Sequence, residues 1–100
     1  MTQNNLGGAL AELGTRSGAE EGRKLLEDAL AAYRSALEVY TKADVPKDWA
    51  MTQNNLGSAL EELGTRSDAE EGRKLLQDGL AAYRSALEVY TKADPPGHGQ

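Results

Sequence analysis

The chain has 100 residues, no cysteine and a formal net charge of -5 at pH 7. The length suits a single domain, and the absence of cysteine excludes disulfides, thiolate metal sites and thiol redox switches. An acidic protein is a poor match for nucleic acids and anionic membranes, which attract basic surfaces. No apolar run is long enough to span a membrane and no signal peptide opens the sequence. We therefore expect a cytoplasmic protein without nucleic-acid or membrane partners.

The sequence is one unit written twice, because the stretch MTQNNLG begins at residue 1 and again at residue 51. Self-similarity at a period of roughly 20 to 50 residues is typical of a solenoid, in which each unit leaves an apolar face for its neighbour to cover. The apolar residues are mainly Ala and Leu, with no Phe, which favours closely packed helices. Residues 1–44 and 51–94 differ at five positions: Gly8/Ser58, Ala11/Glu61, Gly18/Asp68, Glu27/Gln77 and Ala29/Gly79.

The first unit opens with an apolar stripe at helical spacing. Leu6, Leu10 and Leu13 recur on one face, which predicts a helix over about residues 1–14. This helix should end near Gly14, because glycine accepts the left-handed backbone conformation that terminates helices.

A second helix is expected to follow after a short turn. Ser17 and Glu20 have the S-x-x-E spacing of a capping box, in which each side chain satisfies a backbone amide at the start of a helix. The apolar pattern then continues over about residues 18–43, which makes this helix long. Gly22 in its first turns costs about 1 kcal/mol relative to alanine, and whether the helix is continuous there and at Gly72 stays open.

The second unit repeats this order with one additional turn. Pro46 suits the first turn of a helix over about residues 46–64, and Trp49 belongs to a turn that the first helix lacks. Its partner helix is expected over about residues 68–93. The sequence thus predicts an all-α fold, an α-solenoid of two helix-turn-helix hairpins with four helices, of which the second in each hairpin is long. The units are residues 1–44 and 45–94, followed by a flexible tail at 95–100.

The sequence offers no group of residues suited to catalysis or to a cofactor. His98 is the only histidine, and one imidazole cannot build a zinc site or a nucleophilic triad. The stretch GTRSGAEEGRK lacks the spacing of a phosphate-binding loop and carries two glutamates where phosphate would approach. We therefore expect no enzyme activity, no catalytic residue, no metal site and no cofactor.

A six-position pattern occurs in both units and suggests a family. Its residues are Leu6, Gly7, Leu10, Ala29, Tyr33 and Ala36 in the first unit, and Leu56, Gly57, Leu60, Gly79, Tyr83 and Ala86 in the second. This pattern resembles the tetratricopeptide repeat (TPR), in the long form found in kinesin-light-chain-like arrays. The present unit has 50 residues, where the usual TPR has about 34.

The resemblance implies a protein-interaction scaffold that binds a peptide or protein segment on the concave face of the first helix of each hairpin. The family's peptide-binding asparagine corresponds to Asn5 and Asn55, and the alternative is hydrogen bonding between helices. Because the first helix of each hairpin has no Lys or Arg apart from Lys47 at the start of the second, the partner is expected to be neutral or basic rather than acidic. The expected contact residues are Met1, Asn4, Asn5, Gly8, Ala11, Glu12, Met51, Asn54, Asn55, Ser58, Glu61 and Glu62.

A second hypothesis is a self-assembling or designed structural repeat without an external ligand. If the last helix repeats the pattern of the second, one apolar stripe on it stays uncovered and is available to bind a partner. Two units fall short of the three that usually give independent stability, so we expect a homo-oligomer: a dimer, a domain swap through residues 44–48, or end-to-end stacking. The short first helix also suggests a piece excised or engineered from a longer array. The uncovered stripe would comprise Leu75, Ala82 and Val89.

Overall fold

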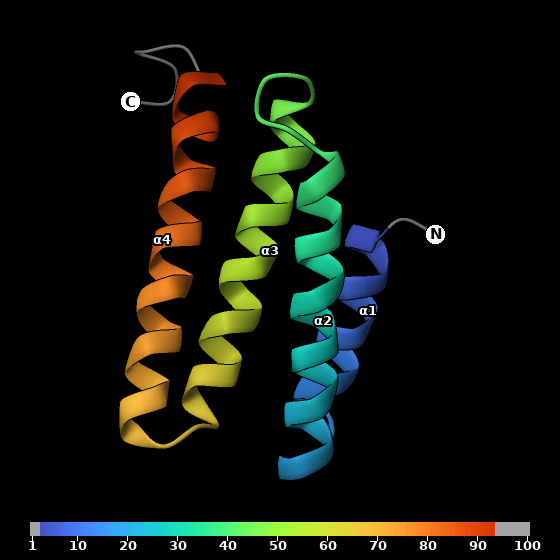
Figure 1. The fold of residues 1–100 in the computed structure, drawn as a ribbon, viewed down its shortest axis with the longest axis vertical. Coiled ribbons are helices and arrows are strands. Elements are labelled where there is room, and N and C mark those ends of the chain that lie inside the picture. The colour runs from blue at the N-terminus through green and yellow to red at the C-terminus, as the bar shows by residue number, and fades with distance from the viewer. Residues whose placement is uncertain (1–2, 94–100) are drawn as a thin grey trace.

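The structure, a computed structural model, describes residues 3–93 and is all-α over that range. Helices α1 (Gln3–Thr15) and α2 (Ala19–Val39) form one antiparallel hairpin, and α3 (Pro46–Thr65) and α4 (Ala69–Ala93) form the next (Figure 1). Each helix packs on the one before it in sequence, as the repeat pattern predicts. Met1, His98 and the tail expected at 95–100 lie outside the described residues. None of the helices within residues 3–93 is both long enough and apolar enough to cross a membrane.

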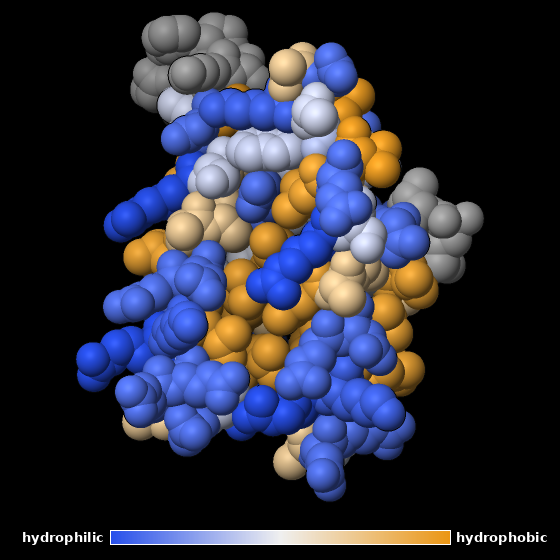
Figure 2. All heavy atoms as spheres, in the orientation of Figure 1, coloured by the Kyte–Doolittle hydropathy of each residue, from blue (hydrophilic) through white to orange (hydrophobic). Residues whose placement is uncertain are grey.

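The main apolar core lies where the two hairpins meet. Helix α3 packs against α4 on one side and α2 on the other, and it also contacts α1. Apolar atoms are visible over α3 between α2 and α4, and along the edge formed by α1 (Figure 2). The core combines residues of α2, α3 and α4: Leu26, Ala29, Leu30, Tyr33, Leu56, Ala59, Leu60, Leu63 and Ala82.

Glycine lets the two helices of each hairpin approach closely near their connecting turn. A Cβ atom on Gly72 would lie 2.7 Å from the carbonyl oxygen of Gly64, and one on Gly22 would lie 2.6 Å from that of Gly14. Both helices are continuous through these glycines, which answers the question that the sequence left open at Gly22 and Gly72. Helix α1 ends at Thr15, one residue beyond the predicted end near Gly14, but Gly14 does not take the left-handed conformation expected of it. The glycines of the hairpins therefore serve close packing.

The predicted capping boxes are wrong in both units. The hydroxyls of Ser17 and Ser67 point back to the preceding helix, where they donate to the carbonyl oxygens of Leu13 (2.7 Å) and Leu63 (2.9 Å). A hydroxyl that satisfies the end of one helix is not available to cap the next. The N-cap position of α2 is the following residue, Gly18.

The Gly18/Asp68 difference changes the start of the second helix in each hairpin. Gly18 has no side chain to accept a hydrogen bond, whereas Asp68 Oδ1 accepts the backbone N–H of Glu71 at 2.9 Å. This is the contact of an N-cap residue. Asp68 therefore stabilises the start of α4 in a way that α2 lacks.

We expect Asp68→Ala to lower the free energy of unfolding by about 1 kcal/mol, because the Glu71 amide loses its acceptor. The matched change Gly18→Ala removes no side-chain cap and is expected to have a smaller effect. Chemical denaturation followed by circular dichroism measures both. Equal losses in the two variants would contradict a capping role for Asp68.

Helices α2 and α4 share the sequence YTKA near their ends but end differently. Helix α4 continues to Ala93, whereas α2 ends at Val39, so the predicted end near residue 43 is wrong. Tyr40 leaves the helix with an extended backbone, and the Thr41 carbonyl accepts the N–H of Val45 at 3.0 Å. The chain must reverse before Pro46 to lay α3 against α2. Tertiary packing thus overrides an identical local sequence.

Candidate functional site

The face shared by α1 and α3 carries the residues predicted to contact a peptide. Asn4 is buried, and its Oδ1 accepts a hydrogen bond from Nδ2 of Asn55 at 3.2 Å. This bond ties α1 to α3, so Asn55 takes part in inter-helix hydrogen bonding, which was the alternative considered for it. Asn5 is exposed on α1.

A cavity of about 110 Å³ lies between α1, α2 and α3. Four of its lining residues belong to the predicted set: Ala11, Asn55, Ser58 and Glu62. The sequence-based prediction missed the other four: Thr15, Leu26, Tyr33 and Ala59. Seven predicted residues within the described range do not line it: Asn4, Asn5, Gly8, Glu12, Met51, Asn54 and Glu61. The structure therefore brings together about a third of the predicted contact residues.

The carboxylates of this face already have partners within the protein. Glu12 pairs with Arg16 at 3.0 Å, and Glu62 pairs with Arg66 at 3.4 Å. Glu61 accepts a hydrogen bond from the Tyr83 hydroxyl at 3.0 Å. The exposed pair at Glu12 contributes little to stability, because solvent screens it. Arginines therefore offset two carboxylates of this face, whereas the partner of Glu61 is an uncharged hydroxyl.

Tyr33 and Tyr83 occupy equivalent positions in different surroundings. Burial raises the pKa of Tyr33, and burial followed by the Glu61 carboxylate raises the pKa of Tyr83, while a hydrogen bond from Ser58 lowers it. The first unit has Ala11 where the second has Glu61. Among the described residues, none hydrogen-bonds to the Tyr33 hydroxyl. Since Ala11 stands where Glu61 accepts the Tyr83 hydroxyl, the Ala11/Glu61 difference is the sequence signal that could have identified Tyr33 as a residue of the groove.

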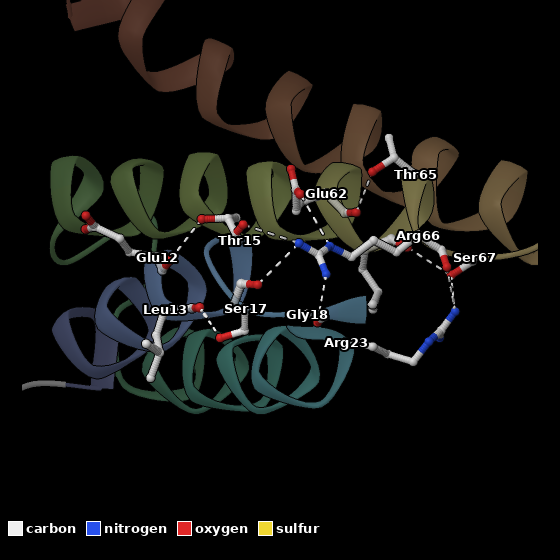
Figure 3. Close-up of polar contacts among 12 residues, drawn as sticks. Glu12, Leu13, Thr15, Ser17, Gly18, Arg23, Glu62, Thr65, Arg66 and Ser67 are labelled. Atoms are coloured by element: carbon white, nitrogen blue, oxygen red, sulfur yellow. Dashed lines mark hydrogen bonds and ion pairs between the residues drawn. The ribbon is translucent and has the colours of Figure 1, made fainter. Parts of the chain in front are cut away.

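Two arginines connect the hairpins at the end where the helices of each hairpin turn (Figure 3). Arg66, at the end of α3, donates to the carbonyl oxygens of Gly14 (3.3 Å), Thr15 (3.4 Å) and Gly18 (3.5 Å). Arg23 of α2 donates in the other direction, to the Arg66 carbonyl at 3.1 Å and to Ser67 Oγ at 3.0 Å. The two contacts together fix how the hairpins align.

The apolar stripe predicted to be uncovered on α4 is in fact covered. Ala82 and Val89 are buried, and Leu75 is half-buried against the main core, so the prediction that these three residues are exposed is wrong. Their side of α4 packs on α3 of the same hairpin. Val89 is covered by Trp49 and Ala50, which belong to the additional turn of α3.

The exposed apolar residues of α4 lie on the neighbouring face. We call this set the α4 outer face: Leu76, Leu80, Leu87 and Tyr90. Leu76 is 43% exposed, whereas its counterpart Leu26 in α2 is 0% exposed, and Leu80 is 49% exposed against 6% for Leu30. The difference arises because α3 covers α2, while no described residue covers α4 in the same way.

No protein-family model, curated protein or solved structure matches the chain. Within residues 3–93, no group of three or more His, Asp or Glu side chains is placed to hold a metal ion. The candidate sites are accordingly the groove around the cavity and the α4 outer face.

Proposed function

We propose that the chain is a protein-interaction scaffold of two TPR-like repeats, without catalytic activity, that binds a peptide segment between α1 and α3. The observation that carries this proposal is the cavity, which is lined by polar side chains of α1 and α3 together with Tyr33 of α2. Among the described residues, neither the Tyr33 hydroxyl nor the Oδ1 of Asn55 has a hydrogen-bond partner. Both atoms are available to a peptide backbone or side chain.

The size of the cavity favours a peptide over a small molecule. Pockets for small ligands usually enclose roughly 300 to 1,000 Å³, whereas this cavity has about 110 Å³. It matches one side chain of a segment that lies across the groove. Solenoid proteins bind their partners along extended concave surfaces.

The charges of the groove favour a neutral or basic segment over an acidic one. Glu62 lines its α3 side, and the Arg66 guanidinium that pairs with Glu62 also donates to carbonyl oxygens of the first hairpin. An acidic peptide would meet the Glu62 carboxylate, whose cationic partner is already shared with the first hairpin.

A random peptide-display library tests this proposal. We expect enriched peptides to bind the unmodified protein and to lose binding on Ser58→Trp, which fills the groove, and on Tyr33→Phe, which removes only the hydroxyl. Ser35→Trp, which adds the same bulk on the exposed side of α2, is the matched control and should bind normally. If no peptide is enriched, or if Ser58→Trp binds as well as Ser35→Trp, the groove is not the binding site.

Self-association is a second candidate function, and the α4 outer face favours it. Three large apolar side chains of α4 are exposed although their counterparts in α2 are buried or half-buried. A contiguous apolar surface of this kind usually marks an interface. We propose that the chain forms oligomers through this face.

Light scattering over a range of protein concentrations tests self-association. We expect the mean mass to rise above 10.7 kDa with concentration, and we expect the double variant Leu80→Glu with Leu87→Glu to remain a monomer. The stripe of Leu75 and Val89 is unsuitable for this test, because charging these residues would disrupt the hairpin. A wild-type mass that stays at 10.7 kDa at every concentration would refute the proposal.

A further inference from the structure

The interface between α2 and α3 is formed by one set of residues on α2 and another set on α3. Because the unit is duplicated, each set recurs on another helix. The α2 set consists of Leu26, Leu30 and Leu37, whose copies form most of the α4 outer face. The α3 set includes Leu56 and Leu63, whose copies on α1 are Leu6 and Leu13. These residues are identical in the two units. The two ends of the molecule therefore carry the two complementary surfaces of its own internal interface.

The copies of these sets on α1 and α4 are uncovered within the described residues. Leu63 is 3% exposed in α3, whereas its copy Leu13 is 54% exposed in α1. Ala59 is likewise buried and its copy Ala9 exposed. We call Leu6, Ala9 and Leu13 the α1 outer face. Helix α3 packs against α2 in addition to its own hairpin partner α4, whereas α1 packs chiefly on its partner α2. The exposure of the α1 outer face therefore reflects the absence of a second neighbouring helix among the described residues.

An arginine fixes the register of the internal interface. The Arg66 guanidinium occupies a socket formed by the carbonyl oxygens of Gly14, Thr15 and Gly18, close to the backbone of Gly22. Gly14 and Thr15 end α1, where the carbonyl oxygens of the last turn carry a partial negative charge that attracts cations. The Arg66 side chain is only 19% exposed there. The socket thus recognises a guanidinium through backbone acceptors.

The second hairpin carries a copy of this socket that no described residue fills. It is an open cleft of about 430 Å³ lined by residues that include Gly64, Ser67, Asp68, Gly72 and Leu76. Asp68 adds a carboxylate where the first unit has Gly18, and Gln77 removes one where the first unit has Glu27. The formal charge of the two sockets is therefore equal, so the second also suits an arginine.

The matching arginine is present on the opposite end of the molecule. Arg16 is the copy of Arg66 at the end of α1, and its side chain is 74% exposed. It pairs with Glu12 at 3.0 Å, as Arg66 pairs with Glu62 at 3.4 Å. Each arginine thus lies at the end of its helix and pairs with the glutamate four residues before it, and the Arg16 guanidinium is exposed where that of Arg66 fills the first socket.

We propose that the α4 cleft binds the Arg16 guanidinium of a second copy of this chain, whose α1 outer face packs on the α4 outer face as α3 packs on α2. This inference rests on the second candidate function and specifies its partner, its polarity and its register. Arg73, the copy of Arg23, would then donate to the Arg16 carbonyl and to Ser17 Oγ of the second copy. The interface joins two different surfaces, so it extends into head-to-tail chains unless the rotation per copy closes a ring.

Charge reversal at the exposed arginine tests the register. We expect Arg16→Glu to weaken self-association on the order of tenfold to a hundredfold, because a charged hydrogen-bond donor is replaced by an anion that faces carbonyl oxygens. Arg34→Glu, an equal charge change on the exposed side of α2, is the control and should associate as the wild type does. Sedimentation equilibrium measures both.

Mixing two variants, each blocked at one end, tests the polarity. Leu80→Glu blocks the α4 outer face, and Leu13→Glu with Arg16→Glu blocks the α1 outer face. Each variant alone should be monomeric, and an equimolar mixture should give a dimer of twice the 10.7 kDa chain mass that grows no further. These residues are largely exposed in the single chain, so helical circular dichroism should be unchanged.

The outcomes separate this inference from self-association as such. A wild-type chain that stays monomeric refutes both. Oligomers of the wild type that Arg16→Glu leaves unchanged, or a variant blocked at α1 that still forms dimers through α4 alone, refute the head-to-tail arrangement while leaving self-association in place. A mixture that forms only the expected dimer supports the arrangement.

Discussion

Replacing Leu26 by alanine is expected to lower the free energy of unfolding by about 3 kcal/mol or more, because a fully buried leucine leaves a cavity in the core. Leu26 is 0% exposed and lies in the cluster that joins α2 to α3. Its copy Leu76 is 43% exposed on α4, so Leu76→Ala should cost less than about 1 kcal/mol. Identical leucines in near-identical units would then differ severalfold in their contribution to the free energy of unfolding.

Urea denaturation at low protein concentration measures this difference, with the helical signal as the readout. A protein of this size has a total stability of roughly 5 to 10 kcal/mol, so Leu26→Ala should lower the denaturation midpoint by about a third or more. The Leu76→Ala effect should grow with protein concentration if the α4 outer face is buried in an oligomer. Equal effects at Leu26 and Leu76 in dilute solution would contradict the asymmetry between the hairpins.

Gly72→Ala is expected to destabilise the protein by roughly 2 kcal/mol, although alanine is the better helix former. Its Cβ would lie 2.7 Å from the Gly64 carbonyl oxygen, and a backbone atom cannot move without separating α3 from α4. Gly8→Ala is the matched control, since the nearest atom to its Cβ, the Tyr33 hydroxyl oxygen, is 3.9 Å away. Gly8→Ala should therefore raise the free energy of unfolding, because the gain in helix propensity, about 1 kcal/mol, meets no steric cost.

The two glycine substitutions thus have opposite expected signs. Thermal denaturation should show a lower Tm for Gly72→Ala and a higher Tm for Gly8→Ala. A shift of about 4 to 8 °C per kcal/mol is typical of domains of this size, so the two midpoints should differ clearly. If both substitutions raise Tm, the close approach of α3 and α4 does not constrain the hairpin.

The order and type of the helices could be predicted from the sequence, because the leucine spacing and the duplicated unit leave few other folds. The residues at which the helices end depend on tertiary packing as well as on the local sequence pattern. The turn after Val39 is imposed by the need to return α3 against α2, and the same residues stay helical before Ala93. The hydroxyl of Ser17 or Ser67 can donate to a carbonyl of the preceding helix or accept an amide of the following one. The S-x-x-E spacing alone does not say which of these bonds forms.

The candidate surfaces were predicted less well than the fold. Two apolar stripes run along α4 one residue apart, and the sequence does not show which one faces its own hairpin. Val89 is buried because the turn that contains Trp49 covers it, while its copy Val39 is 75% exposed. The cavity was found only in part, since Tyr33 comes from α2 rather than from the helices expected to line the groove.

Each helix contacts chiefly its neighbour in the sequence, and this connectivity bears on how the chain folds. When native contacts are close in sequence, little loop entropy is lost before they form. Helical proteins with such low contact order fold in roughly microseconds to milliseconds. Either hairpin can serve as the nucleus on which the other assembles, and the Arg66 contacts with α1 and the α1–α2 turn then form late, when the hairpins dock. Refolding should therefore be fast, and the step that joins the hairpins should be the one most sensitive to substitutions in the α2–α3 interface.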